Sequence, residues 1–360
     1  MKITYFLRDI SDCGGIQQMT VSIINELAMR GYECTVVSLF HKYSAPFFEI
    51  NKSVTLLPLF EHSVDTKSSF IEIRRNASLW LNKINPDILV VQGTSYACYL
   101  TKHIWENIKV IVCEHAYYGL GHFGGLHSIG KHISIKKASA IVALTELDKA
   151  EYKKHSRSDT LIEAIYNPCM IKQPVPAYNI TAKTIVSCGT LDKLKGFDKA
   201  IVVGSKVLPY YKDWKWEIYG DGKERENLQE LIHEQHMDSQ IILRGYSQDK
   251  AEIYSDKSIN VITSSFEGFG LVIAEAMTYG LPGVSFSVKY GPLELIQNQI
   301  EGLTVEYNDL DGMAKCIQKL IEEEELRNRF SINAKKKARL FEVENIVAQW
   351  ETLFRRVINS

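Results

Sequence analysis

The 360-residue sequence has no cysteine pattern that could hold a metal ion or a disulfide framework. Its seven cysteines are odd in number and widely spaced, and no pair is separated by two residues, which is typical of a reducing cytosol. No run approaches the roughly 18 uncharged apolar residues that span a membrane. The apolar run at the N-terminus is broken by Arg8 and Asp9, too early for a signal peptide. We therefore expect a cytoplasmic protein, soluble or at most peripheral to the inner face of the plasma membrane.

The sequence also lacks a strong charge of either sign. Its formal net charge is -1, so bulk charge gives no indication of nucleic-acid binding. The composition is 45% hydrophobic and 24% charged, close to the globular average, which argues against disorder. A chain of 360 residues suits two domains of roughly 150–200 residues each.

Short β-branched runs alternate with longer amphipathic stretches along most of the chain. This alternation predicts βαβ units and parallel sheets, and therefore an α/β fold. Strands are predicted in the first half at residues 3–7, 34–39, 88–92, 110–113 and 140–143, with a helix at 17–30 that ends at Gly31. In the second half, strands are predicted at 184–188, 216–219, 241–243, 259–262 and 283–286, before helices at 310–324, 325–339 and 343–358.

The alternation is interrupted around Asn167-Pro168-Cys169. Residues 172–183 contain two prolines and show little periodicity, so we interpret them as a linker. The predicted domains are then 1–171 and 184–340, with a final helical segment at 341–360. Ligands of such folds bind at the carboxyl ends of the strands, so we expect a site in the cleft between the two domains.

The strongest motif runs from Ser264 to Pro282 and reads SSFEGFGLVIAEAMTYGLP. It follows a predicted strand and opens a predicted helix. Gly268 and Gly270 allow close approach of a ligand to the backbone. The amide groups of Phe269, Gly270 and Leu271 would then face a phosphate at the positive end of the helix.

Two glutamates in this motif carry further chemistry. Glu275 lies about one turn inside the predicted helix, where its carboxylate could accept both hydroxyls of a ribose. Glu267 precedes the helix, within reach of a donor sugar. The plainer alternative makes Glu267 a capping acid and Glu275 a surface residue, but the spacing favours a phosphate and a ribose.

A second motif places Lys195 before Gly196, after the strand end and turn at Gly189. A diphosphate leaving group requires cationic neutralisation, which a lysine can supply without a metal. No acidic cluster of the Asp-x-Asp kind is well placed for Mg²⁺, so we predict a metal-independent site. The alternative is an ordinary solvated lysine in a loop.

Three weaker signals follow other strands. Gly14 and Gly15 open the helix at 17–30, either as a tight turn or as a loop that approaches phosphate or acceptor. His115 follows the strand at 110–113 and would face the cleft, although a lone histidine is more often structural. Gly291 and Glu294 follow the strand at 283–286 and offer backbone amides and an acid beside the cleft.

Residues 131–157 form a basic run, with seven Lys and Arg against three acids. Such a run is usually a solvated surface. The alternative is a surface that contacts an anionic membrane or a phosphate-bearing acceptor.

Taken together, these motifs resemble glycosyltransferase family 4, and the resemblance covers nearly the whole chain. Its most specific mark is the pair Glu267 and Glu275 with seven residues between them. The resemblance implies a GT-B fold of two facing Rossmann-like domains, with the C-terminal helix near Trp350 crossing back onto the N-terminal domain. It also implies a retaining enzyme that uses a nucleotide sugar, here expected to be a UDP-sugar. Similar bacterial enzymes build capsule, O-antigen or teichoic-acid glycans, often on undecaprenyl-diphosphate-linked acceptors.

The resemblance also implies roles for individual residues. Glu275 would bind the donor ribose and Glu267 the donor sugar, while Lys195 and the amides near Leu271 would hold the diphosphate. His115 would touch the transferred sugar or the acceptor. In the family's usual mechanism the leaving phosphate takes the acceptor proton, so we name no protein base. Further donor contacts are expected from Gly15, Gly189, Thr190, Arg244 and Tyr246, the last two beside the nucleobase.

One position departs from the family pattern. Many relatives carry an arginine directly after the glycine at Gly189, where it pairs with the lysine on the diphosphate. Here that position is Thr190. One cation is therefore missing, or another residue such as Lys193 supplies it.

Two other functions stay open at this point. A sugar-nucleotide epimerase shares the GT-B fold, although no acid and base set for it can be identified. A non-catalytic scaffold that binds nucleotide sugars is indicated only by Thr190. A nicotinamide dehydrogenase is excluded, because the loop after the first strand lacks the Gly-x-Gly-x-x-Gly pattern.

Overall fold

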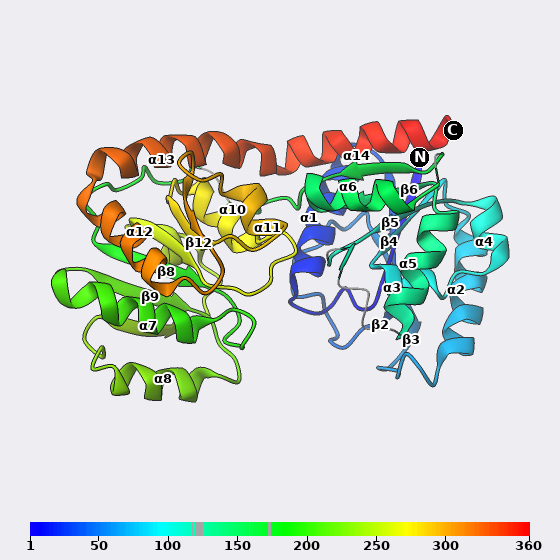
Figure 1. The fold of residues 1–360 in the computed structure, drawn as a ribbon. Coiled ribbons are helices and arrows are strands. Elements are labelled where there is room, and N and C mark those ends of the chain that lie inside the picture. The colour runs from blue at the N-terminus through cyan, green and yellow to red at the C-terminus, as the bar shows by residue number, and fades with distance from the viewer. Residues whose placement is uncertain (117, 120–124, 158, 172–173) are drawn as a thin grey trace. The chain divides into compact units, whose positions relative to one another are not determined.

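Two separate parallel β-sheets organise the chain. The computed structural model describes residues 1–360 apart from 117, 120–124, 158 and 172–173, so the first residues of the predicted linker lie outside the described part. One compact unit consists of Met1–Pro168 and Glu342–Ser360, and the other of Cys169–Phe341. Each unit surrounds its own sheet with helices (Figure 1).

The first unit contains a seven-stranded sheet in the order β3-β2-β1-β4-β5-β6-β7. All neighbouring strands are parallel, and the central strands β1 and β4 are buried along almost their whole length because helices cover both faces. The order changes direction between β1 and β4, which makes their carboxyl ends a binding position in folds of this kind. The strands are β1 Lys2–Leu7, β2 Glu33–Phe40, β3 Thr55–Phe60, β4 Ile88–Gln92, β5 Lys109–Cys113, β6 Ala140–Ala143 and β7 Leu161–Ala164.

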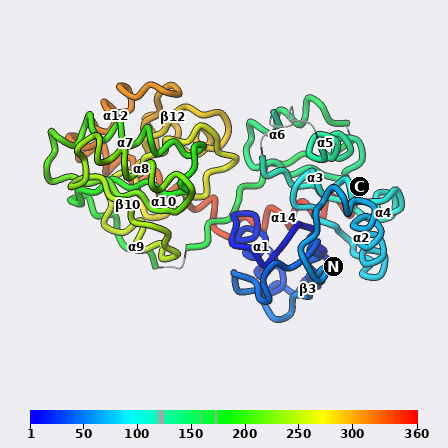
Figure 2. Tube along the Cα trace, turned by 90° about the horizontal axis from the view of Figure 1, so that it is seen from below, coloured from blue at the N-terminus to red at the C-terminus, as the bar shows by residue number. Residues whose placement is uncertain are grey.

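The helices of the first unit include the last helix of the chain. They are α1 Gly15–Met29, α2 Phe70–Ile84, α3 Thr94–Ala97, α4 Lys102–Asn107, α5 Gly125–Lys137, α6 Glu146–His155 and α14 Val343–Ile358. Helix α14 packs against α1, and its Trp350 and Phe354 are buried in the core with β1. Figure 2 shows α14 in red among the blue elements of this unit. Burial of these aromatic side chains supplies the hydrophobic free energy that holds the C-terminal helix here.

The second unit contains a six-stranded parallel sheet in the order β10-β9-β8-β11-β12-β13. The strands are β8 Thr184–Cys188, β9 Lys215–Tyr219, β10 Ile241–Gly245, β11 Ile259–Ile262, β12 Gly283–Phe286 and β13 Gly302–Val305. Here the order changes direction between β8 and β11. The segments that leave the carboxyl ends of these two strands are the two motifs that the sequence singled out.

Helices cover both faces of the second sheet around a core that includes the fully buried Trp216. They are α7 Phe197–Val207, α8 Arg225–Glu234, α9 Lys250–Tyr254, α10 Leu271–Thr278, α11 Gly291–Leu295, α12 Leu310–Glu322 and α13 Glu324–Ala338, with short 3₁₀ turns at Leu208–Tyr210 and Arg339–Phe341. The segment after the predicted linker start lies on this unit, because Tyr178 donates to the Ser258 carbonyl at 2.9 Å. No helix within the described ranges is both long enough and apolar enough to cross a bilayer.

All ten predicted strands are present, with bounds that shift by at most two residues. Three strands were missed, and each is an edge strand: β3, β7 and β13. An edge strand has one side without a partner, so its hydrophobic pattern is weaker; β3 even contains Pro58. The predicted helix at 17–30 begins earlier, at Gly15, and Gly31 beyond its end has φ 86°, as expected of a helix-ending glycine.

Candidate active site

Two loops meet at the carboxyl ends of β8 and β11. Leu194 in the first loop accepts the amide of Ser265 in the second at 2.8 Å, and the hydroxyl of Thr263 donates to the Lys195 carbonyl at 2.9 Å. Gly196 has φ 63°, and a Cβ there would lie 2.5 Å from the Thr263 carbonyl oxygen. Only glycine allows this close approach, so the backbone of both loops is held in place by local packing.

Lys195 and Glu267 form an ion pair across these two loops. The ammonium lies 2.6 Å from Glu267 Oε1, and the hydroxyl of Ser264 donates to the same oxygen at 2.8 Å. Glu267 is 7% exposed. Helix α10 begins after Gly270, which is its N-cap residue, and the Glu267 carboxylate contacts Lys195 and Ser264, so Glu267 does not occupy the N-cap position. The structure thus brings together Lys195, which the sequence analysis assigned to the diphosphate, and Glu267, which it assigned to the donor sugar.

The start of α10 lies beside this pair. Gly270 is its N-cap with φ 91°, and Leu271 is the first helical residue. The first amides of a helix have no carbonyl partner within the helix, and they carry its positive dipole end. Phe269, just before, is buried and packs edge-on against Phe341. A Cβ on Gly291 would lie 2.6 Å from the Phe269 carbonyl oxygen, so the start of α11 packs closely against the Gly268–Gly270 loop.

Glu275 is buried one turn into α10, which makes the surface alternative wrong. Its exposed fraction is 3%, and its carboxylate is held by two groups from α9. Lys250 Nζ lies 2.8 Å from Oε1 and 2.9 Å from Oε2, and the Tyr254 hydroxyl donates to Oε2 at 2.9 Å. Burial opposes the charged form of Lys250, but the Glu275 carboxylate outweighs it and raises the pKa of the ammonium. The sequence analysis missed Lys250 and Tyr254, because α9 has only five residues and no recognisable motif.

Cys188 is the last residue of β8, and charged groups of both ion pairs affect its thiol. Burial and then the Glu275 carboxylate raise the pKa of its thiol to about 11, while the charges of Lys250 and Lys195 act in the opposite direction. One thiol therefore lies within electrostatic range of Glu275, Lys250 and Lys195.

The other donor residues predicted in this unit lie outside the two ion pairs. Arg244 forms an ion pair with Glu217 of β9, which also pairs with Lys257 at 2.6 Å. Tyr246 is exposed. Thr190 and Lys193 are exposed in the turn after Gly189, where the Thr190 carbonyl accepts the Asp192 amide at 2.8 Å. Gly189 itself has φ 158° and faces the aliphatic part of Lys195.

Glu294 is in α11, where its backbone carbonyl accepts a hydrogen bond from the Lys337 ammonium at 2.8 Å.

Gly14 and Gly15 lie at the start of α1 in the first unit. Gly14 is the N-cap residue and Gly15 the first helical residue. The turn is fixed by Asp9, whose carbonyl accepts from the Gln17 side chain at 2.8 Å and whose carboxylate accepts the Ser11 hydroxyl at 2.6 Å. Gly14 and Gly15 therefore lie in a structured loop after β1. The strand order of the sheet changes direction beside it, between β1 and β4.

His115 follows β5, and its ring makes a hydrogen bond to the neighbouring strand β4. Its Nε2 lies 2.6 Å from Gln92 Oε1 at the end of β4. With the Gln92 oxygen as acceptor, Nε2 carries the proton and Nδ1 keeps a lone pair. Burial lowers the pKa of His115 to about 4, so the ring is neutral at pH 7. The sequence motif included Glu114 but gave it no role, and the structure shows that it organises this turn.

Glu114 is 2% exposed and accepts several hydrogen bonds. Its Oε1 accepts the amides of His115 and Ala116 at 2.9 and 3.0 Å. Its Oε2 accepts the hydroxyls of Thr94 and Tyr152 at 3.0 and 3.1 Å. These hydrogen bonds fix the backbone that carries His115.

The basic run at 131–157 is partly neutralised. Lys149 pairs with Glu163 at 3.1 Å, Lys154 with Glu151 at 2.8 Å, and Arg157 with Asp159. The segment therefore carries less free positive charge than its sequence indicates.

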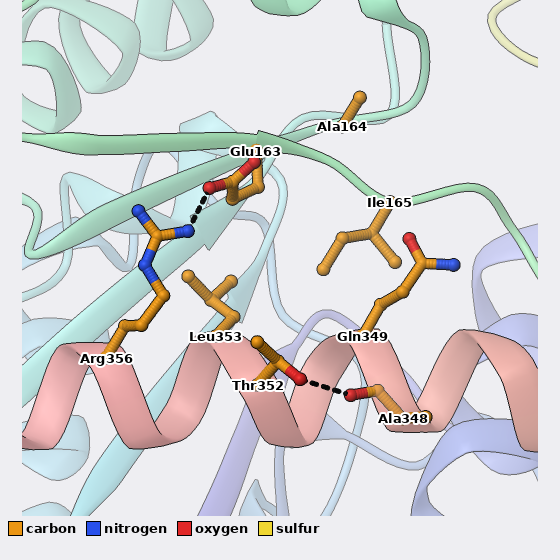
Figure 3. Close-up of a pocket in the computed structure, with 8 residues that line it drawn as sticks. All are labelled: Glu163, Ala164, Ile165, Ala348, Gln349, Thr352, Leu353 and Arg356. Carbon is orange, nitrogen blue, oxygen red and sulfur yellow. Dashed lines mark hydrogen bonds and ion pairs between the residues drawn. The ribbon is translucent and has the colours of Figure 1, made fainter.

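A recess of about 340 Å³ lies in the first unit between β7 and α14 (Figure 3). Arg356 reaches across it to Glu163, and none of the predicted site residues lines it. It is lined by Glu163, Ala164, Ile165, Ala348, Gln349, Thr352, Leu353 and Arg356. The recess lies where the C-terminal helix packs against the edge strand.

In the described ranges, no group of three His, Cys, Asp or Glu side chains could hold a metal ion.

Family models match both halves of the chain. The model described as "Glycosyltransferase Family 4" matches residues 13–171, and the one described as "Glycosyl transferases group 1" matches residues 172–337. The chain is 26% identical over 351 residues to an uncharacterised glycosyltransferase of Haemophilus influenzae, covering 97% of this chain and 99% of that protein. It is 24% identical over 374 residues, 100% of both chains, to a Campylobacter jejuni enzyme named GalNAc-alpha-(1->4)-GalNAc-alpha-(1->3)-diNAcBac-PP-undecaprenol alpha-1,4-N-acetyl-D-galactosaminyltransferase.

The fold is also similar to a solved structure. A crystal structure of an S. aureus TarM mutant in complex with fondaparinux, alpha-GlcNAc-glycerol and UDP superposes with a TM-score of 0.78 at 17% identity, covering 98% of this chain and 99% of that one. This likeness confirms the GT-B fold. The chain therefore belongs to the group 1, family 4 glycosyltransferases, and it is a glycosyltransferase.

Proposed function

We propose that this enzyme is a retaining, metal-independent transferase that moves a hexose or N-acetylhexosamine from a UDP-sugar to a glycan or lipid-linked acceptor in bacterial surface polysaccharide synthesis. The observation that carries the proposal is the Lys195–Glu267 pair beside the start of α10, with Glu275 buried one turn farther on. A cation, a helix N-terminus and a carboxylate at this spacing fit a diphosphate followed by a ribose. The structure of TarM with UDP supports the choice of nucleotide.

In the proposed complex, Lys195 and the amides of Gly270 and Leu271 bind the diphosphate, and Glu275 accepts hydrogen bonds from the ribose. Glu267 accepts from hydroxyls of the donor sugar. Gly268 and Phe269 shape the loop around the sugar, and Gly189 and Thr190 border the phosphates. Arg244 and Tyr246 border the base, and Gly291 and Glu294 of α11 complete the phosphate side.

The proposed transfer step breaks the bond between the sugar anomeric carbon and the phosphate oxygen. The acceptor hydroxyl oxygen forms its bond to that carbon on the same face, and its proton passes to the departing phosphate oxygen, so UDP leaves protonated at that oxygen. Negative charge grows on the phosphate in the transition state. Lys195 and the helix amides stabilise that charge, which lowers the barrier because they are already in place.

His115, Gly14 and Gly15 of the first unit are proposed to act on the sugar or acceptor side. A neutral His115 offers the lone pair of Nδ1 as an acceptor for a sugar hydroxyl. The Gly14-Gly15 turn offers backbone amides. The Campylobacter relative acts on an undecaprenol-linked saccharide, as its name states, which supports a lipid-linked acceptor at the inner face of the plasma membrane. The basic residues of 131–157 that pair with no carboxylate in the described part of the chain would then approach anionic headgroups.

The test is a donor screen on the purified protein, with and without EDTA, that reads both thermal shift and nucleotide release. A ligand that binds the native state raises the melting temperature by mass action. We expect UDP and one UDP-hexose or UDP-N-acetylhexosamine to raise it, with no effect of EDTA. Glu275→Ala should abolish the shift, whereas Glu230→Ala, which removes an exposed glutamate of the same unit, should retain it. Stabilisation by GDP- or ADP-sugars alone would overturn the choice of donor.

A further inference from the structure

The proposed donor site leaves one partly buried charge without a role, the ammonium of Lys250. Its side chain is 27% exposed, and its ammonium contacts both oxygens of Glu275. Tyr254 already donates to Oε2 of the same carboxylate. A lysine beside a ribose-binding carboxylate occupies lone pairs that the ribose hydroxyls would need. A ribose that binds to Glu275 would therefore displace the ammonium from at least part of the carboxylate.

The charges at this strand end point to that function. Lys195 is neutralised by Glu267, and Lys250 is neutralised by Glu275, so the four side chains together carry no net charge. A nucleoside diphosphate sugar brings one negative charge on each of its two phosphates. Burying such an anion without a matching cation is costly.

The other residues that we assign to the phosphates and the base supply no second buried cation. Arg244 is engaged with Glu217 on β9, and Thr190 is uncharged in the turn after Gly189. Lys193 lies in the same turn and is exposed, so any contact that it makes with a phosphate would be solvated. Lys250, in contrast, is partly buried beside α10, and the Cys188 thiol lies within electrostatic range of both Lys250 and Lys195.

We propose that Lys250 is the second cation of the nucleotide site. On donor binding its ammonium exchanges Glu275 for the diphosphate, and the ribose hydroxyls take the released lone pairs of the carboxylate. This inference rests on the proposed function and deepens it by naming the group that replaces the arginine absent at position 190.

The geometry suits such an exchange. Glu275 lies four residues beyond the start of α10, which is a rise of about 6 Å along the helix axis. A lysine ammonium is a compact charge on a flexible stem, so it can cover part of that distance by changing rotamer. Tyr254 keeps its bond to Oε2 and also lies 3.4 Å from the Val272 carbonyl, so the carboxylate remains held while Lys250 moves. A carboxylate has about four acceptor positions, enough for one tyrosine and two ribose hydroxyls.

The experiment measures the affinities of uridine, UMP and UDP for the wild type and for Lys250→Met by calorimetry. Uridine contains the ribose but no phosphate, so the ratio of UDP to uridine affinity reports phosphate contacts within one variant, whatever its stability. We expect Lys250→Met to lose about tenfold or more in this ratio, the scale of one hydrogen bond between charged groups. Lys250→Arg should keep most of it. Lys206→Met, which removes a cation from the exposed pair with Asp311, is the matched control and should leave the ratio unchanged.

A second variant gives an independent check. Adding Thr190→Arg to Lys250→Met should restore the ratio toward the wild-type value, because it returns a cation to the diphosphate side. Equal losses of uridine and UDP affinity in Lys250→Met would show that Lys250 only positions Glu275, and an unchanged ratio would likewise overturn the proposal. A wild type that binds uridine and UDP equally well, or neither, would overturn the proposed donor site itself.

Discussion

Lys195 and Glu267 are 72 residues apart in the sequence, yet their Nζ and Oε1 atoms lie 2.6 Å apart. They meet because β8 and β11 are neighbours in the sheet, and each residue lies in the loop beyond its strand's carboxyl end. The pair adjoins the helix start that we assign to the diphosphate. Removing one partner leaves the other charge partly buried and uncompensated, so the pair is sensitive to substitution.

Substitution of Lys195 should lower turnover more than donor affinity. In Lys195→Met the growing charge on the leaving phosphate loses a preorganised cation, so we expect kcat to fall by about 10²- to 10³-fold. Steady-state kinetics on the best UDP-sugar measures this. Lys183→Met removes a lysine from an exposed pair with Asp213 in the same unit and should leave kcat unchanged. A Lys195→Met enzyme with near wild-type kcat would refute the assignment.

Gly196 should tolerate no side chain. Gly196→Ala forces a left-handed residue, which costs roughly 1–2 kcal/mol, and also places Cβ 2.5 Å from the Thr263 carbonyl oxygen. Gly245→Ala is the matched control, because Gly245 also has a positive φ, of 83°, but no atom lies within 4 Å of its added Cβ. We expect a clearly larger drop in melting temperature for Gly196→Ala than for Gly245→Ala. Equal drops would show that the close approach of the two loops is unimportant.

The pH dependence of stability should include a contribution from His115. Its pKa is about 4 in the folded protein against an ordinary value of 6.5, so the unfolded chain binds a proton that the folded protein does not. The resulting stability is present above pH 6.5 and is lost as pH falls toward 4, by at most about 3 kcal/mol. As the pH falls below 6.5, the melting temperature of the wild type should therefore decrease more than that of His115→Gln. A difference that stays constant from pH 7 to 4 would contradict the depressed pKa.

Asp148 should contribute with the opposite sign. Burial raises its pKa to about 7, the Glu114 carboxylate adds to this, and the Tyr118 amide that donates at 2.7 Å acts against it. The folded protein thus retains a proton that the unfolded chain releases above pH 3.8, and stability falls as pH rises from 3.8 to 7.

Asp148→Asn removes this penalty and keeps an oxygen to accept the Tyr118 amide. The variant should melt above the wild type at pH 8, by a margin that reflects at most about 4 kcal/mol, and the margin should shrink toward pH 4. Thermal melts at pH 4, 6 and 8 measure it. If Asp148→Asn were less stable at every pH, the carboxylate would be ionised and well solvated in the folded protein.

Local sequence pattern was sufficient to predict the fold class and most of the strands. Central strands such as β4 are buried on both faces, so their apolar runs are visible without any knowledge of their neighbours. The edge strands β3, β7 and β13 were missed, because each is only partly buried and has a strand partner on one side alone, so its apolar pattern is weak. Glycines and acids at the strand ends were recognisable for the same local reason: a turn that needs glycine leaves its mark in a few consecutive residues.

The partners of the site residues were decided by the tertiary structure alone. The sequence indicated Glu275, but the two groups that hold it come from α9, 25 and 21 residues earlier. In the same way, His115 is oriented by Gln92, 23 residues away on the neighbouring strand. Hydrogen bonds and ion pairs act over a few ångströms in space, and nothing in the spacing of residues records which distant segments the sheet order brings within that range.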